Sequence, residues 1–162
     1  MRIRTQGIAL RYACVPMLVT GAQETEVVAV ITAATVFARA SIIGAPGPIV
    51  IDETSYRRGP GISERAALRV AQATGSRRGA AAGVIRCEEP RPRTHQRCAS
   101  AAGAVVLTFA RPEIRDSVAT VGLAYTYVDY RGRPVGQEWA LELQRSPNGQ
   151  WRVTRSKETG VS

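Results

Sequence analysis

The pattern of hydrophobic and polar positions changes near Ala104. Beyond this residue, large apolar side chains recur at every second position in several successive stretches. Side chains alternate between the two faces of a strand, so this period predicts strands with one buried face. The alternating positions are Val105, Leu107 and Phe109; Val121, Leu123, Tyr125 and Tyr127; Val135, Trp139, Leu141 and Leu143; and Trp151 and Val153.

These stretches are separated by short turn signals. They predict strands over about 105–109, 117–129, 135–143 and 151–156, and the Asn148-Gly149 dipeptide is favoured in hairpin turns. Four strands joined by short reversals predict a curved antiparallel meander with one apolar and one polar face. The polar face is expected to carry Thr120, Thr126, Glu138, Glu142, Arg152 and Thr154.

The first half of the chain has a helical period instead. Apolar residues at three- and four-residue steps predict a helix over about 24–40, and Ser63 is a suitable N-cap for a second helix to about Ala73. Short strands are predicted at 49–51 and 84–86, with a mobile connection over 74–83. The predicted fold class is α+β, with N-terminal helices packed on the four-stranded antiparallel meander. The first helical stripe is Val27, Val30, Ile31, Ala34, Phe37 and Ala38.

The N-terminus is typical of a secretory signal. Three arginines precede a short apolar run and a small-residue end near Ala22, which predicts a signal peptide over 1–22 and one domain over 23–162. The alternatives are cleavage at Ala38-Arg39-Ala40, or a cytoplasmic protein. The apolar run of this signal and the one that precedes Ala38 are both shorter than the roughly 18 to 20 residues that span a bilayer, so no transmembrane helix is expected. The predicted signal favours a periplasmic or secreted location.

Cysteine usage agrees with export. Cys14 lies in the predicted signal, which leaves Cys87 and Cys98 around a loop with two prolines and no apolar residue. We expect a disulfide between them, which would contribute about 2.5 to 3 kcal/mol in the chain-entropy estimate. Two separate thiols are the alternative in a cytoplasmic protein. His95 is the single histidine, so a zinc site of Cys and His ligands cannot be assembled and no metal site is predicted.

The net charge of +9 comes almost entirely from arginine, since Lys157 is the only lysine. Arginines bind phosphate or carboxylate groups, but the same bias follows from a GC-rich coding sequence without any function. The arginines are scattered, with pairs at Arg57-Arg58 and Arg77-Arg78. Nucleic-acid binding usually needs a concentrated basic face, so it is not favoured.

Common catalytic motifs are absent from the sequence. It contains no phosphate-binding glycine loop, dinucleotide fingerprint, nucleophile elbow or His-Glu-x-x-His zinc motif. His95 lies in a proline- and arginine-rich loop, which favours a solvated side chain. The sequence therefore indicates no catalytic residue and no cofactor.

The order of helices, middle loop and meander resembles the NTF2-like or cystatin-like α+β superfamily. The segment from Trp139 to Val153, with its Asn-Gly turn and Gly-x-Trp-x-Val ending, is similar to the closing hairpin of those folds and of small exported bacterial proteins. The resemblance implies a cone-shaped pocket between sheet and helices. Tyr125, Tyr127, Trp139 and Asp52 would line it, although the three aromatic residues also suit an ordinary core.

Three functional hypotheses follow. We expect an exported, non-catalytic binding or interaction domain with a small-molecule or protein partner. The alternative is an NTF2-like small-molecule enzyme or carrier that uses the cone-shaped pocket. A nucleic-acid or anionic-surface binder is the third, with a charge that falls from +9 to +6 when cleavage after Ala22 removes Arg2, Arg4 and Arg11. Glu138 and Glu142 are weak catalytic candidates because they alternate onto the solvated face.

Overall fold

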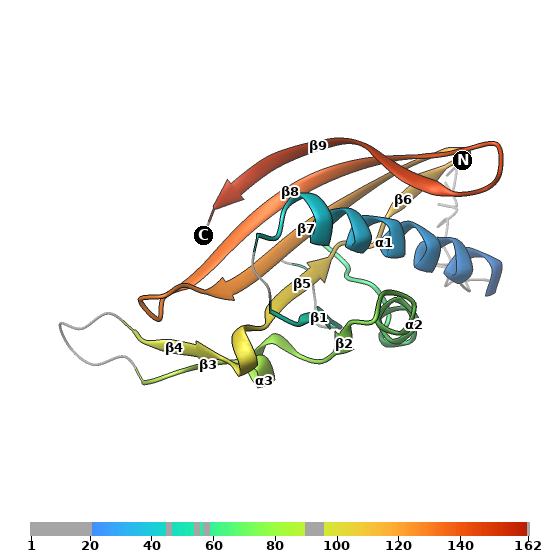
Figure 1. Ribbon diagram of the computed structural model, residues 1–162. Coiled ribbons are helices and arrows are strands. Elements are labelled where there is room, and N and C mark those ends of the chain that lie inside the picture. Colours follow the sequence, from blue (N-terminus) through green and yellow to red (C-terminus); the bar gives the residue numbers. More distant parts are fainter. Residues whose placement is uncertain (1–20, 45–46, 54–55, 57–58, 90–95, 162) are drawn as a thin grey trace, which may run out of the picture.

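A computed structural model describes residues 21–44, 47–53, 56, 59–89 and 96–161, and has an α+β architecture (Figure 1). The helices are α1 (Gly21–Ser41), α2 (Glu64–Thr74), α3 (Ala81–Val84) and the 3-10 turn η1 (Ala101–Gly103). The strands are β1 (Ile49–Asp52), β2 (Arg77–Arg78), β3 (Ile85–Cys87), β4 (Cys98–Ser100), β5 (Val105–Phe109), β6 (Glu113–Arg115), β7 (Val118–Val128), β8 (Pro134–Arg145) and β9 (Trp151–Val161).

The predicted meander is present within a larger mixed sheet. Strands β5, β7, β8 and β9 are antiparallel neighbours, and Figure 1 shows the long strands β7 to β9 as a curved layer. The prediction of a four-stranded sheet is wrong, because the sheet has seven strands in the order β2-β1-β5-β7-β8-β9, with β6 paired to β7. Strands β3 and β4 form a separate two-stranded ribbon.

The three additional strands join the sheet for different physical reasons. The whole of β1 is buried, and it lies parallel to β5 and β2. A strand buried on both faces gives an unbroken apolar run, which locates the strand but not its partner. Strands β2 and β6 have only two and three residues and expose charged side chains, so they are too short to show a recognisable period in the sequence.

The connection predicted to be mobile over 74–83 contains regular structure. Helix α2 ends at Thr74, and Gly75 caps it in the left-handed conformation with φ 63°. Strand β2 and the start of α3 follow. This regular structure was not predicted because exposed arginines and alanines form neither a period of two nor one of 3.6.

Helices α1 and α2 cover one face of the sheet. The apolar stripe predicted for the first helix is confirmed, and Val30, Ile31 and Ala34 are fully buried. The predicted cap of α2 is also confirmed, since the Ser63 hydroxyl accepts a hydrogen bond from the Ala66 amide at 3.1 Å. The odd-numbered residues of β7 and β8 pack against these helices and form the main core. Stability is therefore concentrated on this face.

The opposite face is covered only in part. Val50 and Val106, on the even-numbered side of β1 and β5, form a second small core with Ala104. Side chains from α3 and β3 pack against it. Farther along β7 and β8, the even-numbered positions have no described helix over them. This open part of the sheet holds the candidate site.

The predicted disulfide is confirmed, since Cys87 and Cys98 are bonded across the β3–β4 ribbon. Most of the loop between them, including His95, lies outside the described residues. The predicted signal over 1–22 also lies outside them, apart from Gly21 and Ala22 at the start of α1. Within the described part of the chain, no helix combines the length and apolar character required to cross a membrane.

Candidate functional site

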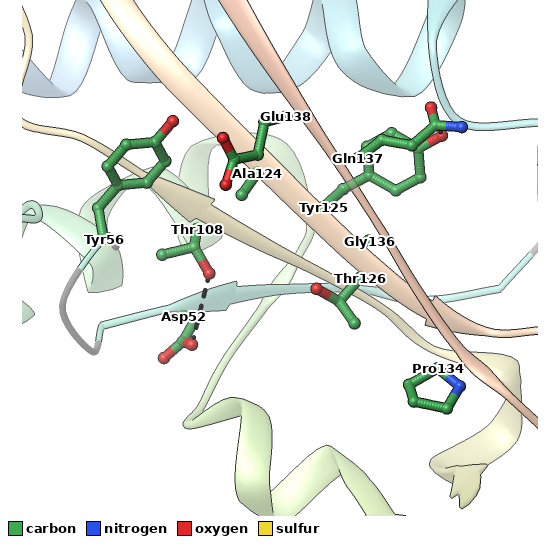
Figure 2. Close-up of a pocket in the computed structure, with 10 residues that line it drawn as sticks. All are labelled: Asp52, Tyr56, Thr108, Ala124, Tyr125, Thr126, Pro134, Gly136, Gln137 and Glu138. Carbon is green, nitrogen blue, oxygen red and sulfur yellow. Dashed lines mark hydrogen bonds between the residues drawn. The ribbon is translucent and has the colours of Figure 1, made fainter. Parts of the chain in front are cut away.

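A pocket of about 360 Å³ opens on the uncovered part of the sheet (Figure 2). Most of its wall comes from even-numbered positions of β7 and β8, together with residues of β1 and β5 that share their face. Its lining residues are Asp52, Tyr56, Thr108, Ala124, Tyr125, Thr126, Pro134, Gly136, Gln137 and Glu138.

Sheet register brings the polar residues of this pocket together. Asp52 pairs with Thr108, Thr108 with Ala124, and Ala124 with Glu138, across four neighbouring strands. Residues opposite one another in paired strands project to the same face. The two carboxylates therefore lie in one transverse row, separated by a threonine and an alanine.

Small side chains keep the middle of this row open. Ala124 and Thr126 lie side by side along β7, and Gly136, which pairs with Thr126, has no side chain to fill the adjacent space. Figure 2 shows Tyr56 and Pro134 toward opposite sides of the group, with Glu138 and Thr126 between them. The pocket is thus produced by residue size along two regular strands.

Tyr56 closes one end of the pocket by packing over Gly122. A Cβ atom at position 122 would lie 2.7 Å from the Tyr56 hydroxyl oxygen, so the approach requires glycine. Tyr56 is only 8% exposed. A second hollow continues on the same face beyond Gly122, where Glu142, Arg155 and Lys157 give it mixed charge. Tyr56 therefore lies at the border between an acidic and a mixed region.

The described lining of the first pocket carries two carboxylates. Asp52 is 4% exposed, and the Thr108 hydroxyl donates to its carboxylate at 3.5 Å. Asp52, Tyr56 and Glu138 each make at least one further interaction within the protein. Among the described residues that line the pocket, the charged ones are Asp52 and Glu138. A locally acidic surface attracts cationic groups, even though the whole chain is strongly basic.

The predicted aromatic pocket residues lie mainly on the other face. The Tyr125 and Tyr127 rings stack with centroids 5.9 Å apart, and they line a hollow of about 220 Å³ with Ile43, Gly44 and Val105. The Tyr125 hydroxyl donates to Gln137 Oε1 at 2.5 Å. Burial, followed by the neighbouring Tyr127 and Glu158, raises the pKa of Tyr125, which stays a neutral donor at pH 7.

Trp139 does not line the hollow that Tyr125 and Tyr127 share. It is half-buried and packs against the main core, opposite Leu123 on β7. Around these positions the helix-covered face is filled, since Leu123, Leu141 and Leu143 are at most 1% exposed. Of the residues named from the sequence for a pocket, Asp52 and Tyr125 border the one on the open face.

Sequence reasoning missed Tyr56 and undervalued Glu138. Tyr56 follows β1 in a polar segment, and nothing in its spacing indicates that it is buried. Alternation placed Glu138 on the face opposite the core, and that placement is confirmed by its register with Ala124. Its side chain is half-buried rather than fully solvated. Alternation identifies a face but not the hollows in it.

The described residues offer no group of three or more His, Cys, Asp or Glu side chains placed to hold a metal ion. Comparison with protein-family models, with curated proteins and with solved structures finds no match to the chain. The function is therefore argued from the geometry and charge of the pocket.

Proposed function

We propose that this protein is an exported, non-catalytic binding domain whose pocket accepts a small polar ligand with an amino group. The observation that carries the proposal is the acidic pocket itself, which holds Asp52 and Glu138 in a chain of net charge +9. A concave site with a few convergent polar groups is the usual form of a small-ligand site. A protonated amine would add to the interactions that Asp52 and Glu138 already make within the protein, while Thr108 and Thr126 offer hydroxyl groups.

The disulfide supports the exported location, because such bonds persist mainly in oxidising compartments. The packing of α1 favours cleavage near Ala22 over cleavage at Ala40. Glu26 accepts a hydrogen bond from Trp151 Nε1 at 3.1 Å and pairs with Arg145 at 3.2 Å. Cleavage at Ala40 would remove these contacts and the buried stripe of α1. The mass of the mature protein from the periplasm of an expressing cell tests the site of cleavage.

Ligand binding is tested with three probes of equal chain length. The probes are 1,4-diaminobutane, 1,4-butanediol and succinate, titrated into the disulfide-intact protein and followed by amide NMR shifts. We expect the diamine to shift β7 and β8 amides around Ala124 and Glu138, the diol to act more weakly, and succinate to leave them unchanged. Equal responses to all three probes would contradict a site selected by charge.

Variants distinguish this pocket from general surface charge. Ala124→Leu adds bulk to the floor, and Glu138→Gln removes one carboxylate, so each should weaken diamine binding by about tenfold, or about 1.4 kcal/mol. The matched control is Glu142→Gln, which removes a carboxylate from the same strand and face but outside this pocket. An equal loss in the control would assign binding to the net charge of the face.

The second candidate function is the NTF2-like small-molecule enzyme or carrier. It is favoured by the buried Asp52 carboxylate in a pocket wall, a placement common in acid and base chemistry. The relationship to that superfamily is supported by the N-terminal helix that lies along the curved sheet. This candidate differs in expecting a released product. Mass spectrometry of a metabolite mixture before and after incubation with the protein would reveal one.

A further inference from the structure

Another pocket, of about 490 Å³, lies away from the hollows described above, between the β3–β4 ribbon and the turn that joins β7 to β8. It lies outside the main core and shares no lining residue with the acidic pocket. Its lining residues are Arg86, Glu88, Arg97, Cys98, Ala99, Tyr130, Arg131 and Gly132. Three of these are arginines and one is a glutamate, so the lining carries a positive excess.

The register of the ribbon places two of the arginines on one face. Arg86 pairs with Ala99, and the Glu88 amide donates to the Arg97 carbonyl at 2.8 Å, which extends the pairing by one step. Side chains alternate along each strand, so Arg86 and Arg97 project to the same side of the ribbon. The bonded pair Cys87 and Cys98 projects to the other side and holds the two strands together.

The third arginine comes from a turn with fixed geometry. Asp129 accepts hydrogen bonds from the Arg131 amide at 2.9 Å and from the Arg133 amide at 2.8 Å. Its carboxylate also pairs with the Arg133 guanidinium at 2.9 Å. These contacts, the Arg133 amide first, lower the pKa of Asp129. The carboxylate is thus occupied by Arg133 and the turn, while the Arg131 guanidinium lies over the Tyr130 ring at 5.2 Å.

The ribbon and the turn are held to each other. The Cys98 amide donates to the Gly132 carbonyl at 2.7 Å. Gly132 has a left-handed φ of 73°, and a Cβ atom there would lie 3.3 Å from the Cys98 carbonyl oxygen. A glycine thus allows the close approach of the two segments. The disulfide, the turn and this hydrogen bond preorganise the walls, which lowers the cost of binding.

Some arginines of the described chain are paired with carboxylates, whereas those of this pocket, like Arg69 and Arg152, are not. Arg78 pairs with Glu53 and Glu64, and Arg145 pairs with Glu26. Within the described residues, Arg86, Arg97 and Arg131 have no carboxylate within ion-pair distance. Guanidinium groups match the oxygens of phosphate with paired hydrogen bonds. Tyr130 is 88% exposed beside them and offers a ring surface to a ligand.

We propose that Arg86, Arg97 and Arg131 form a binding site for a phosphate ester whose ring packs against Tyr130. The pocket suits a small molecule because its three cations converge on one hollow instead of following an extended tract. Such a phosphate could belong to a free sugar phosphate or to a lipid headgroup that contains a ring. The chemistry recognised is the same in both cases, and the experiment distinguishes the two sources.

The test is a titration of the full, disulfide-intact protein with glucose 6-phosphate, inorganic phosphate and glucose. We expect glucose 6-phosphate to shift the amides of Tyr130, Gly132 and Cys98 and to bind more tightly than inorganic phosphate, while glucose leaves them unchanged. Vesicles of phosphatidylcholine with phosphatidylinositol form the lipid arm, against vesicles of phosphatidylcholine alone. Shifts at these amides with the inositol lipid but not with glucose 6-phosphate would assign the site to headgroups.

Charge-matched variants make the result specific. Arg97→Gln and Arg131→Gln should each weaken binding of the responding phosphate ligand about tenfold. Arg69→Gln is the control, because Arg69 is exposed on α2 and lies outside the pocket. Tyr130→Ala should reduce the advantage of glucose 6-phosphate over inorganic phosphate. Unchanged circular dichroism and melting temperature would show that the variants are folded.

Several results would overturn the proposal. Equal weakening by Arg69→Gln would indicate general electrostatic attraction. An absence of shifts with both glucose 6-phosphate and the inositol vesicles would remove the site. Tighter binding of a single-stranded oligonucleotide, with shifts spread over the surface beyond this pocket, would replace it with a nucleic-acid interface.

Discussion

The two faces of β7 and β8 use the same strands for different purposes. On the helix-covered face, Val121 and Leu123 are at most 3% exposed and belong to the main core. On the open face, Gly122 and Ala124 alternate with them along β7 and border hollows. Large alternate residues fill space and stabilise the sheet, whereas small alternate residues leave space for a ligand. Period-two spacing therefore separates stability from binding along one strand.

The two faces also differ in what holds their side chains in place. The covered face depends on apolar burial, which is non-directional and scales with area. The open face and the neighbouring ribbon depend on hydrogen bonds, a disulfide and charge at Thr108, Cys87–Cys98 and Asp129. Stability and ligand binding should consequently respond to different substitutions and conditions.

The largest effect is expected from truncation on the covered face. Leu123 is fully buried, so Leu123→Ala removes apolar contacts and leaves a cavity, at a cost of about 2 to 5 kcal/mol in the free energy of unfolding. Thr126→Ala, on the open face of the same strand, should cost about 0.5 kcal/mol or less. Urea denaturation followed by tryptophan fluorescence measures both. Similar losses for the two variants would break the contrast between the faces.

The sequence predicts those elements of the fold that local patterns determine. Alternation located β7 and β8, and the Ser63 cap located the start of α2. The turn at Asn148-Gly149 was predicted from its dipeptide, and Gly149 has the positive φ, 84°, that favours glycine. These features depend on neighbours within a few residues. They required no knowledge of how distant segments meet.

The candidate site depends on distant segments and was only partly predicted. Thr108 and Asp52 are 56 residues apart in sequence, and their pairing is fixed by the parallel register of β1 and β5. Tyr56 becomes buried only because Gly122 leaves room for its ring. The resemblance directed attention to aromatic residues on the covered face, whereas the acidic pocket lies on the open one. Register and side-chain fit are tertiary properties that spacing alone does not encode.

Removal of the disulfide should give the next largest effect, confined to the ribbon. The bond joins residues 11 positions apart, and the chain-entropy estimate for a loop of this size is about 3 kcal/mol. Because β3 and β4 form their own two-stranded sheet, this loss should appear as local opening. In Cys87→Ser/Cys98→Ser, hydrogen exchange should accelerate at Arg86 and Cys98 positions and remain slow at Leu123.

The stability of the main core in the disulfide variant tests whether the opening is local. The urea midpoint monitored by Trp151, which is buried in the main core, should change much less than it does in Leu123→Ala. A shift of equal size would show that the ribbon and the sheet unfold as one unit. Phosphate-ester binding should weaken in the same variant, while diamine binding at the acidic pocket should remain.

The smallest effect is a pH dependence at the turn that carries Tyr130. Hydrogen bonds from the Arg133 amide, then its guanidinium and the Arg131 amide, lower the pKa of Asp129 in the folded protein. A carboxyl group with a lowered folded pKa contributes stability above its unfolded pKa of about 4, and that contribution disappears as pH falls through the folded pKa. Asp129→Asn should therefore be less stable than the parent at pH 6 and nearly equal to it at strongly acidic pH.

The pH dependence of Asp129→Asn is interpreted by comparison with Leu123→Ala on the covered face. Leu123→Ala changes apolar contacts without changing a charge, so its loss of stability should be similar at both pH values, whereas the loss in Asp129→Asn should vanish on acidification. Asp116→Asn controls for removal of one negative charge from another turn. The measurement is the difference in urea midpoint from the parent at each pH. If the loss in Asp129→Asn persisted in acid, the turn would be held by the shape of the side chain, and charge would not distinguish the open side of the molecule from the covered one.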